Sequence, residues 1–293
     1  MEQHLKIDLH MHSTVSDGTD TPEEILARVR EAGIALFAVT DHDAVKAGRI
    51  IPPLLAEGDP AFLTGAEFSC RDEEGKYHIL GYGYDPDAEP IRKLVETGHG
   101  LRMNKVQARL DFLKKEFGFA FPEKELNWLF AQDNPGKPHI ANLMVRLGYA
   151  ETKEQAIKDF INRIHFRNEY VRPEQAIQSI LGGGGIPVLA HPSYGDGDQL
   201  ILGAEMEKRL QRLMEFGLQG VEAFYSGFTP RIRGELLSFA ERLGLYVTAG
   251  SDYHGKNKLI DLGDTELDEA AAWPEGLRRF LNDTEKKQKK HEI

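Results

Sequence analysis

Short apolar segments alternate with amphipathic stretches along most of this chain, and the alternation predicts an α/β fold. Apolar runs of strand length, bounded by turn residues, are expected to form buried strands. They occupy residues 5–9, 35–40, 61–66, 77–82, 186–190, 219–224 and 245–249. Helix-start signals such as Thr21-Pro22 and helical apolar spacing lie between several of these runs. Because strands and helices alternate, we expect a parallel, barrel-like sheet.

The alternation stops between about residues 87 and 172, where no strand pattern is visible. Residues 101–113, 140–147 and 153–164 instead show amphipathic helical periodicity. We therefore expect a helical insertion, residues 87–172, between the fourth and fifth strands of a barrel domain made of residues 1–86 and 173–293. Residues 88–172 hold 15 Lys and Arg against 11 Asp and Glu, a net charge of +4, whereas the whole chain carries −11.

The expected strands end repeatedly in His, Asp or Glu. His10 and His12 follow the first strand, with Asp17 on a nearby glycine turn, and strand alternation points both rings to one side. Two histidines alone are also typical of ordinary packing, but the pattern recurs at later strand ends. Parallel barrels place functional side chains at those ends, and imidazoles with carboxylates bind divalent metals. The further candidate metal ligands are His42, Glu67, His78, His191, Asp252 and His254.

Positive charges are grouped in the expected insertion. Arg102, Lys105 and Arg109 lie on one helix face, which is either a solvated face or part of a lid that presents cations to an anionic substrate. Lys137 and His139 lie in a Pro- and Gly-rich turn before a helix, and helix N-termini favour anions. The turn either contacts phosphate or only faces water. Arg102, Lys137 and His139 are thus the candidate substrate-binding residues.

Composition excludes several classes of protein. The single cysteine, Cys70, excludes an intrachain disulfide and favours a reducing cytoplasm. No signal-peptide pattern is present, and no run approaches the ~20 apolar residues that span a bilayer. We therefore expect a cytoplasmic protein without membrane contact. The net charge of −11 opposes binding along duplex DNA, which needs an extended basic surface. Nothing in the sequence indicates an obligate protein partner.

An ordered series of motifs runs along the chain: His10-Met-His12, Ser16-Asp17-Gly18, Thr40-Asp41-His42-Asp43, Glu67, Tyr77-His78, Ala190-His191-Pro192 and Gly250-Ser251-Asp252-Tyr253-His254. From about residue 5 to 263 they resemble the motifs of the PHP (polymerase and histidinol phosphatase) family. The resemblance implies a distorted (β/α)7 barrel with two to three divalent metal ions, which would be Mn, Fe or Zn. The Asp17 version of the motif, with the Gly-Lys-Pro-His turn, resembles a branch that acts on nucleoside 3′,5′-bisphosphates and on short RNA from its 5′ end.

The resemblance also implies a ligand set, carried over residue by residue. A first metal would be held by His10, His12, Glu67 and Asp252. Glu67 would bridge to a second metal, which His78 and His191 complete. A third metal would lie between Asp17, His42 and His254.

We therefore expect a metal-dependent phosphoric ester hydrolase in which a metal-activated hydroxide attacks a nucleotide phosphate. Glu67, Asp252 and His191 are the expected catalytic residues, and Asp41, Asp43, His191 or a metal-bound water would protonate the leaving oxygen. A histidinol-phosphate phosphatase or other small phosphomonoesterase is an alternative, although that branch usually has His where this chain has Asp17. The competing hypotheses are metal-dependent amide hydrolysis and a non-catalytic nucleic-acid-binding accessory module.

Overall fold

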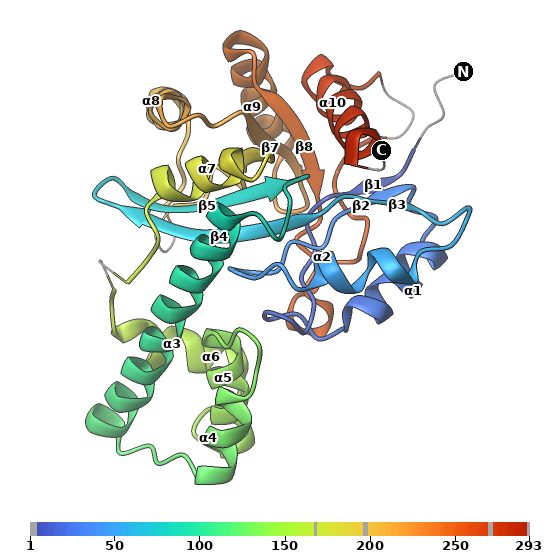
Figure 1. Ribbon diagram of the computed structural model, residues 1–293. Coiled ribbons are helices and arrows are strands. Elements are labelled where there is room, and N and C mark those ends of the chain that lie inside the picture. The colour runs from blue at the N-terminus through green and yellow to red at the C-terminus, as the bar shows by residue number, and fades with distance from the viewer. Residues whose placement is uncertain (1–4, 167–168, 196–198, 269–271, 292–293) are drawn as a thin grey trace.

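Two β-sheets meet near the centre of the molecule in the part of the chain that the structure describes (Figure 1). The computed structural model describes residues 5–166, 169–195, 199–268 and 272–291. The smaller sheet is parallel, with the order β1–β2–β3, and the larger has the order β4–β5–β6–β7–β8. The strands are β1 Ile7–Asp8, β2 Leu36–Phe37, β3 Ala61–Phe62, β4 Gly65–Asp72, β5 Gly75–Tyr82, β6 Ile186–Leu189, β7 Gly220–Tyr225 and β8 Tyr246–Gly250.

The predicted α/β class with parallel strands is confirmed, but neither sheet closes into the expected barrel. Strands β6, β7 and β8 are parallel, whereas β5 runs antiparallel to both β4 and β6. The tight turn at Glu73-Glu74 makes β4 and β5 antiparallel, because parallel neighbours need a crossover of about a dozen residues. The expected strand at residues 61–66 is divided between β3 and β4, so the strand–helix repeat is broken there.

Helices cover the sheets on their outer faces. Helices α1 and α2 contact each other beside the small sheet, whereas α7 packs on β4, β5 and β6, and α9 and α10 pack on β8 (Figure 1). The predicted start of α1 is confirmed by a capping box, in which Thr21 and Glu24 each accept a hydrogen bond from the other's backbone N–H. The bounds are α1 Pro22–Glu31, α2 Ala47–Ile50, η1 Pro52–Leu54, α7 Pro173–Gly182, α8 Gly203–Glu215, α9 Pro230–Leu243, η4 Gly255–Asn257 and α10 Glu275–His291.

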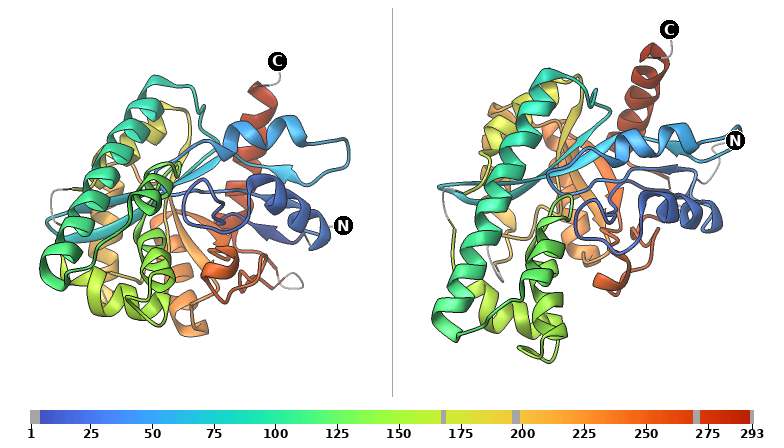
Figure 2. Two further views of the ribbon diagram at one scale, coloured as in Figure 1. Left: turned by 90° about the horizontal axis from the view of Figure 1, so that it is seen from below. Right: turned by 60° about the horizontal axis from the view of Figure 1, so that its bottom comes forward.

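The segment between β5 and β6 begins with a group of helices, as the sequence predicts (Figure 2). Helix α3 belongs to two cores: Ile91 and Leu94 pack with the large sheet, whereas Val106, Leu110 and Leu113 pack with the other insertion helices. The division of the chain at residues 87 and 172 stays a prediction. The helices are α3 Glu89–Phe117, α4 Glu123–Phe130, α5 Lys137–Arg146, α6 Lys153–Gln155, the π-helix η2 Ala156–Phe160 and η3 Ile161–Arg163.

No helix among the described residues has the length and apolar character that crossing a membrane requires.

Candidate metal centre

Segments beyond the strand ends bring the candidate ligands together. Met11 forms a parallel bridge with Tyr253, which joins the chain after β1 to the chain after β8. His42, beyond β2, forms another with Glu67 of β4. These two bridges connect the small sheet to both edges of the large one. The histidines and carboxylates on four separate segments therefore converge at the line where the sheets meet.

A first group of ligand atoms comes from His10, His12, Glu67 and Asp252. The two Nε2 atoms of His10 and His12 lie 3.2 Å apart. From these nitrogens, Glu67 Oε2 is 3.4 and 3.2 Å away and Asp252 Oδ1 is 3.6 and 3.3 Å away. Ligand atoms about 2.1 Å from a tetrahedral metal are roughly 3.4 Å from one another. The spacing of His10, His12 and Glu67 therefore fits one metal ion, with Asp252 Oδ1 close to both histidines.

Glu67 also faces a second group with its other oxygen. Its Oε1 lies 2.7 Å from His78 Nδ1 and 3.0 Å from His191 Nε2. The sequence placed Glu67 at the end of a strand, but it is an interior residue of β4. Glu67 Oε2 and His42 Nδ1 lie 3.0 Å apart, and both are buried without a hydrogen bond among the described residues. Unsatisfied buried polar atoms are costly, and a metal ion would satisfy both.

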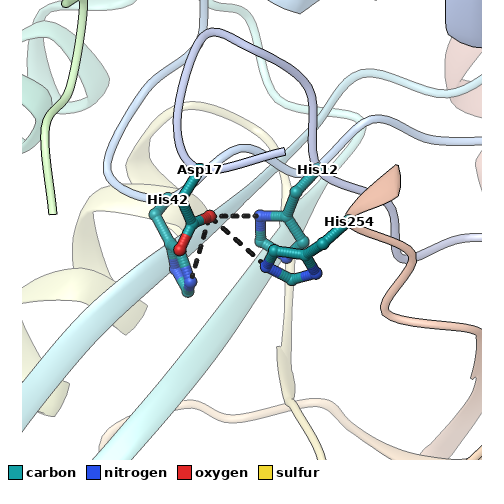
Figure 3. Close-up of side chains that lie close together, drawn as sticks. All are labelled: His12, Asp17, His42 and His254. Atoms are coloured by element: carbon teal, nitrogen blue, oxygen red, sulfur yellow. Dashed lines mark ion pairs between the residues drawn. The ribbon is translucent and has the colours of Figure 1, made fainter. Parts of the chain in front are cut away.

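A third group surrounds Asp17 (Figure 3). Asp17 Oδ1 lies 3.3 Å from His254 Nε2 and 3.9 Å from both His42 Nε2 and His12 Nδ1. These four residues form one of the clusters able to hold a metal in the described part of the chain. His12 and His42 thus face two groups each, one with each ring nitrogen. The structure brings all nine predicted ligands into one connected site, while their roles stay a prediction.

The electrostatics favour the ligand forms of His42, His78 and Glu67. Burial lowers the pKa of His78 to about 4 and the pKa of His42 well below its usual value, so both rings are neutral at neutral pH. Burial opposes ionisation of Glu67, but the neighbouring imidazoles, His78 foremost, hold its pKa well below normal. Neutral imidazoles and ionised carboxylates are the forms that bind metals. Burial alone would lower the pKa of His10 and His12, but the carboxylates around them raise it, to about 9 for His12, and the same negative charge would attract a metal cation. The donor set therefore fits divalent metal ions.

Several supporting residues were missed by the sequence analysis. Glu222, fully buried on β7, lies 2.9 Å from His10 Nδ1 and accepts a hydrogen bond from the backbone N–H of His191 at 2.7 Å. Asp252 Oδ2 accepts hydrogen bonds from Tyr225 and Lys258. A carboxylate on the far nitrogen of a ligating histidine fixes its orientation. The signal for Glu222 was a charged residue inside an apolar strand.

Two candidates for the leaving-group proton are engaged elsewhere. Asp41 accepts hydrogen bonds from the hydroxyl groups of Ser13 and Ser16 at 2.7 Å each. Asp43 pairs with Arg102 and accepts from the backbone N–H of Ser69 at 2.8 Å. Both carboxylates therefore hold the loops of the site in place.

Two cavities open on this site. The metal-side cavity, about 230 Å³, is lined by residues that include Glu67, His191, Tyr225, Asp252 and Lys258. The basic cavity, about 240 Å³, is lined by residues that include Asp17, Arg102, Lys105, Arg109 and Lys137. His42, Lys76 and His78 line both. The two cavities are thus neighbours across the candidate metal ligands.

The three predicted substrate-binding residues differ in whether they line the basic cavity. Arg102 lies on the wall of the basic cavity but forms a buried ion pair with Asp43, at 2.5 Å. Lys137 lies on the same wall and donates to Asn162 Oδ1 at 2.6 Å. His139 is not among the residues lining either cavity; its Nδ1 accepts the backbone N–H of Gly136 at 3.1 Å.

Residues 8–284 match the family model described as the PHP domain. The chain belongs to the PHP domain family. The resemblance seen in the motifs is therefore confirmed. A curated relative, the 3′,5′-nucleoside bisphosphate phosphatase of Chromobacterium violaceum, is 29% identical over 89% of this chain and 91% of its own length.

Other PHP relatives act on different phosphate esters. The phosphoribosyl 1,2-cyclic phosphate 1,2-diphosphodiesterase of Eggerthella lenta is 30% identical over 85% of this chain and 94% of its own length. The 5′-3′ exoribonuclease of Haemophilus influenzae is 28% identical over 88% and 93%. A crystal structure from Bifidobacterium adolescentis, assigned to the metal-dependent phosphoesterases, superposes with a TM-score of 0.79 at 28% identity, covering 95% of this chain and 96% of that one. The predicted class, a metal-dependent phosphoric ester hydrolase, is confirmed.

Proposed function

We propose that this PHP protein hydrolyses a phosphate ester of a nucleotide that carries a second phosphate, either a nucleoside 3′,5′-bisphosphate or the 5′ end of a short RNA. The observation that carries this proposal is the basic cavity, which lies beside the metal-side cavity. His42 and His78 line both cavities. A substrate with one phosphate needs only the metal-side cavity. A second anion has a matching place in the basic cavity.

The nine candidate ligands would hold two to three divalent metals, Mn, Fe or Zn. Bound there, the metals would activate a water at neutral pH and neutralise charge on the phosphoryl oxygens. Glu67 would help to hold both the first and the second metal, because each of its oxygens faces a different ligand group. Asp252 would be held in place by Tyr225 and Lys258, and His191 by Glu222.

Lys105 and Arg109 are the residues that support an anion subsite most strongly. They are 6% and 4% exposed, and Arg109 Nε has no hydrogen-bond partner among the described residues. Burial, with Arg102 next, lowers the pKa of Lys105 to about 7, and burial lowers the pKa of Arg109 to about 10. Buried cations without enough countercharge gain stability from an anion. A phosphate between these side chains would supply it.

Arg102, Lys137 and His139, which the sequence predicts to bind substrate, then have different roles. Lys137 would contact the same phosphate, because it also lines the basic cavity. Arg102 would contact it while staying paired with Asp43, and so would fix the subsite relative to the metals. His139 would act through the turn at Gly136, whose backbone it binds.

We also propose that residues 87–172 act as a substrate-binding lid domain, which their separate apolar core supports. A cytoplasmic location is proposed because the single cysteine, Cys70, is buried and unpaired. The expected partners are the phosphorylated substrates alone, without duplex DNA or membrane.

An assay of released phosphate, nucleotide and free amine tests the function. The protein, stripped of metal and reloaded with manganese, would receive a nucleoside 3′,5′-bisphosphate, a 5′-phosphorylated oligoribonucleotide, histidinol phosphate and an N-acyl amino acid. Turnover of either of the first two above histidinol phosphate supports the proposal. Preference for histidinol phosphate, cleavage of the amide alone, or no turnover with manganese contradicts it.

A further inference from the structure

Three segments of the insertion, residues 87–172, contact the loops that carry Asp17, His42 and His254. The contacting residues are Arg102 on α3, Asn134 between α4 and α5, and Lys153 at the start of α6. The contacts therefore come from both ends of the insertion and from its middle. They all converge on the loops of the third ligand group.

The loop with His42 is held from two sides. Asn134, 1% exposed, donates a hydrogen bond from its side-chain nitrogen to the carbonyl oxygen of His42. Arg102 binds Asp43, the next residue, through Nε at 3.1 Å and Nη2 at 2.5 Å. Asp43 has a φ of 50°, a strained value for a residue other than glycine. Contacts with the insertion thus stabilise the backbone on which the His42 ring stands.

The loops with Asp17 and His254 are held by one chain of contacts. Lys153 Nζ donates to the carbonyl oxygen of Asn257 at 2.5 Å. The side chain of Asn257, three residues after His254, donates to the carbonyl oxygen of Asp17 at 2.7 Å. A single lysine of the insertion is thereby connected to both remaining loops.

The first and second ligand groups are supported differently. His78 and Glu67 lie on paired strands β5 and β4, and His10 is held by Glu222 of β7. These supports belong to the sheets, so the first two groups depend less on the insertion, although they share His12 and His42 with the third.

We propose that the insertion clamps the third metal site, with Asn134, Lys153 and Asn257 as positioning residues. Docking of the insertion and occupancy of the third site then stabilise each other, as linkage requires. This inference rests on the metal assignment of the proposed function. Loss of the contacts through Lys153 and Asn257 weakens the third site most, because the loops that they hold carry Asp17 and His254, which face that site alone.

Lys153→Met tests the clamp, because it removes the ammonium and keeps an unbranched side chain that reaches as far as the lysine Cε. Lys158→Met, at an exposed position of the same segment, is the matched control. Asn257→Ala provides a second variant from the barrel side. Metal-free samples are titrated with manganese for the number of sites and their dissociation constants. Hydrogen exchange of α5 and α6 is measured with and without manganese.

The expected result is two unchanged sites in Lys153→Met and a third site weakened by about tenfold, the scale of one charged hydrogen bond. Lys158→Met keeps all three sites, and filling the third site slows exchange in α5 and α6 of the unsubstituted protein. Unchanged third-site affinity in both Lys153→Met and Asn257→Ala overturns the clamp, as does a protein that binds only two metals. Loss of every site in the unsubstituted protein would instead contradict the proposed function.

Discussion

Glu222 Oε1 lies 2.9 Å from His10 Nδ1, on the opposite side of the ring from the nitrogen that faces Glu67. Both partners are fully buried. This carboxylate fixes which nitrogen of His10 is free to bind a metal. Glu222 therefore belongs to the metal centre although it would touch no metal itself.

Replacing Glu222 with Gln tests this role. The side chain keeps its shape but loses the negative charge that supports His10, so we expect metal affinity at the first site to fall about 10- to 100-fold. The dissociation constant for manganese measures the effect. Glu241→Gln, at an exposed position of α9, serves as control. Equal affinities in the two variants would mean that Glu222 has only a packing role.

Glu67→Gln is expected to abolish phosphate release and to lower metal content at both of the first two sites. The reason is that its two oxygens face different ligand groups, at 3.2 Å from His12 and 2.7 Å from His78. Elemental analysis and the phosphate assay measure the outcome together, with Glu73→Gln in the hairpin turn as control. Full activity in Glu67→Gln would remove it from the centre.

Asp17→Asn is expected to act on the third site alone. Asp17 Oδ1 is the carboxylate oxygen that faces His12, His42 and His254 (Figure 3). We predict that the variant keeps two metals, loses the third and turns over substrate more slowly. Metal content after dialysis and the rate of substrate turnover test this prediction. A variant with three metals and unchanged kinetics would show that the third site is assigned incorrectly.

Substrate affinity is expected to depend on the protonation of Lys105. Burial places its pKa at about 7, so the cationic form dominates below that pH and is lost above it. KM for a bisphosphate should therefore rise as pH increases above 7, by up to about tenfold per unit. Lys105→Arg, which stays charged, should remove most of this dependence. A pH profile of KM shared by both proteins would contradict the assignment.

Much of the metal centre could be predicted from the sequence because its residues follow apolar strands. His10, His12 and His42 are adjacent to short buried segments, so their convergence follows from the fold class alone. Glu67 was placed at a strand end because the hairpin turn at Glu73-Glu74 was not recognised. With that turn, β4 continues past Glu67 and pairs antiparallel with β5.

The supporting contacts could not be predicted, because they join distant positions. Arg102 and Asp43 are 59 residues apart, and Glu222 and His10 are 212 apart. Residue spacing identifies the helix face that carries Arg102, Lys105 and Arg109, but not the carboxylate that one of them meets. Among the described residues, Arg102 is paired with Asp43, whereas Lys105 and Arg109 lie over the rings of Tyr170 and Phe166, which only the packed structure reveals.

Arg109→Met tests most directly whether the site binds a second phosphate beside the metals. The measurement is kcat/KM for a nucleoside 3′,5′-bisphosphate and for a simple aryl phosphate, with Arg92→Met at an exposed position of α3 as control. A charged hydrogen bond is worth about 1.5–3 kcal/mol, so we predict a ten- to hundredfold loss on the bisphosphate, chiefly in KM, and little loss on the aryl phosphate. Equal losses on both substrates, or no loss on either, would contradict the account.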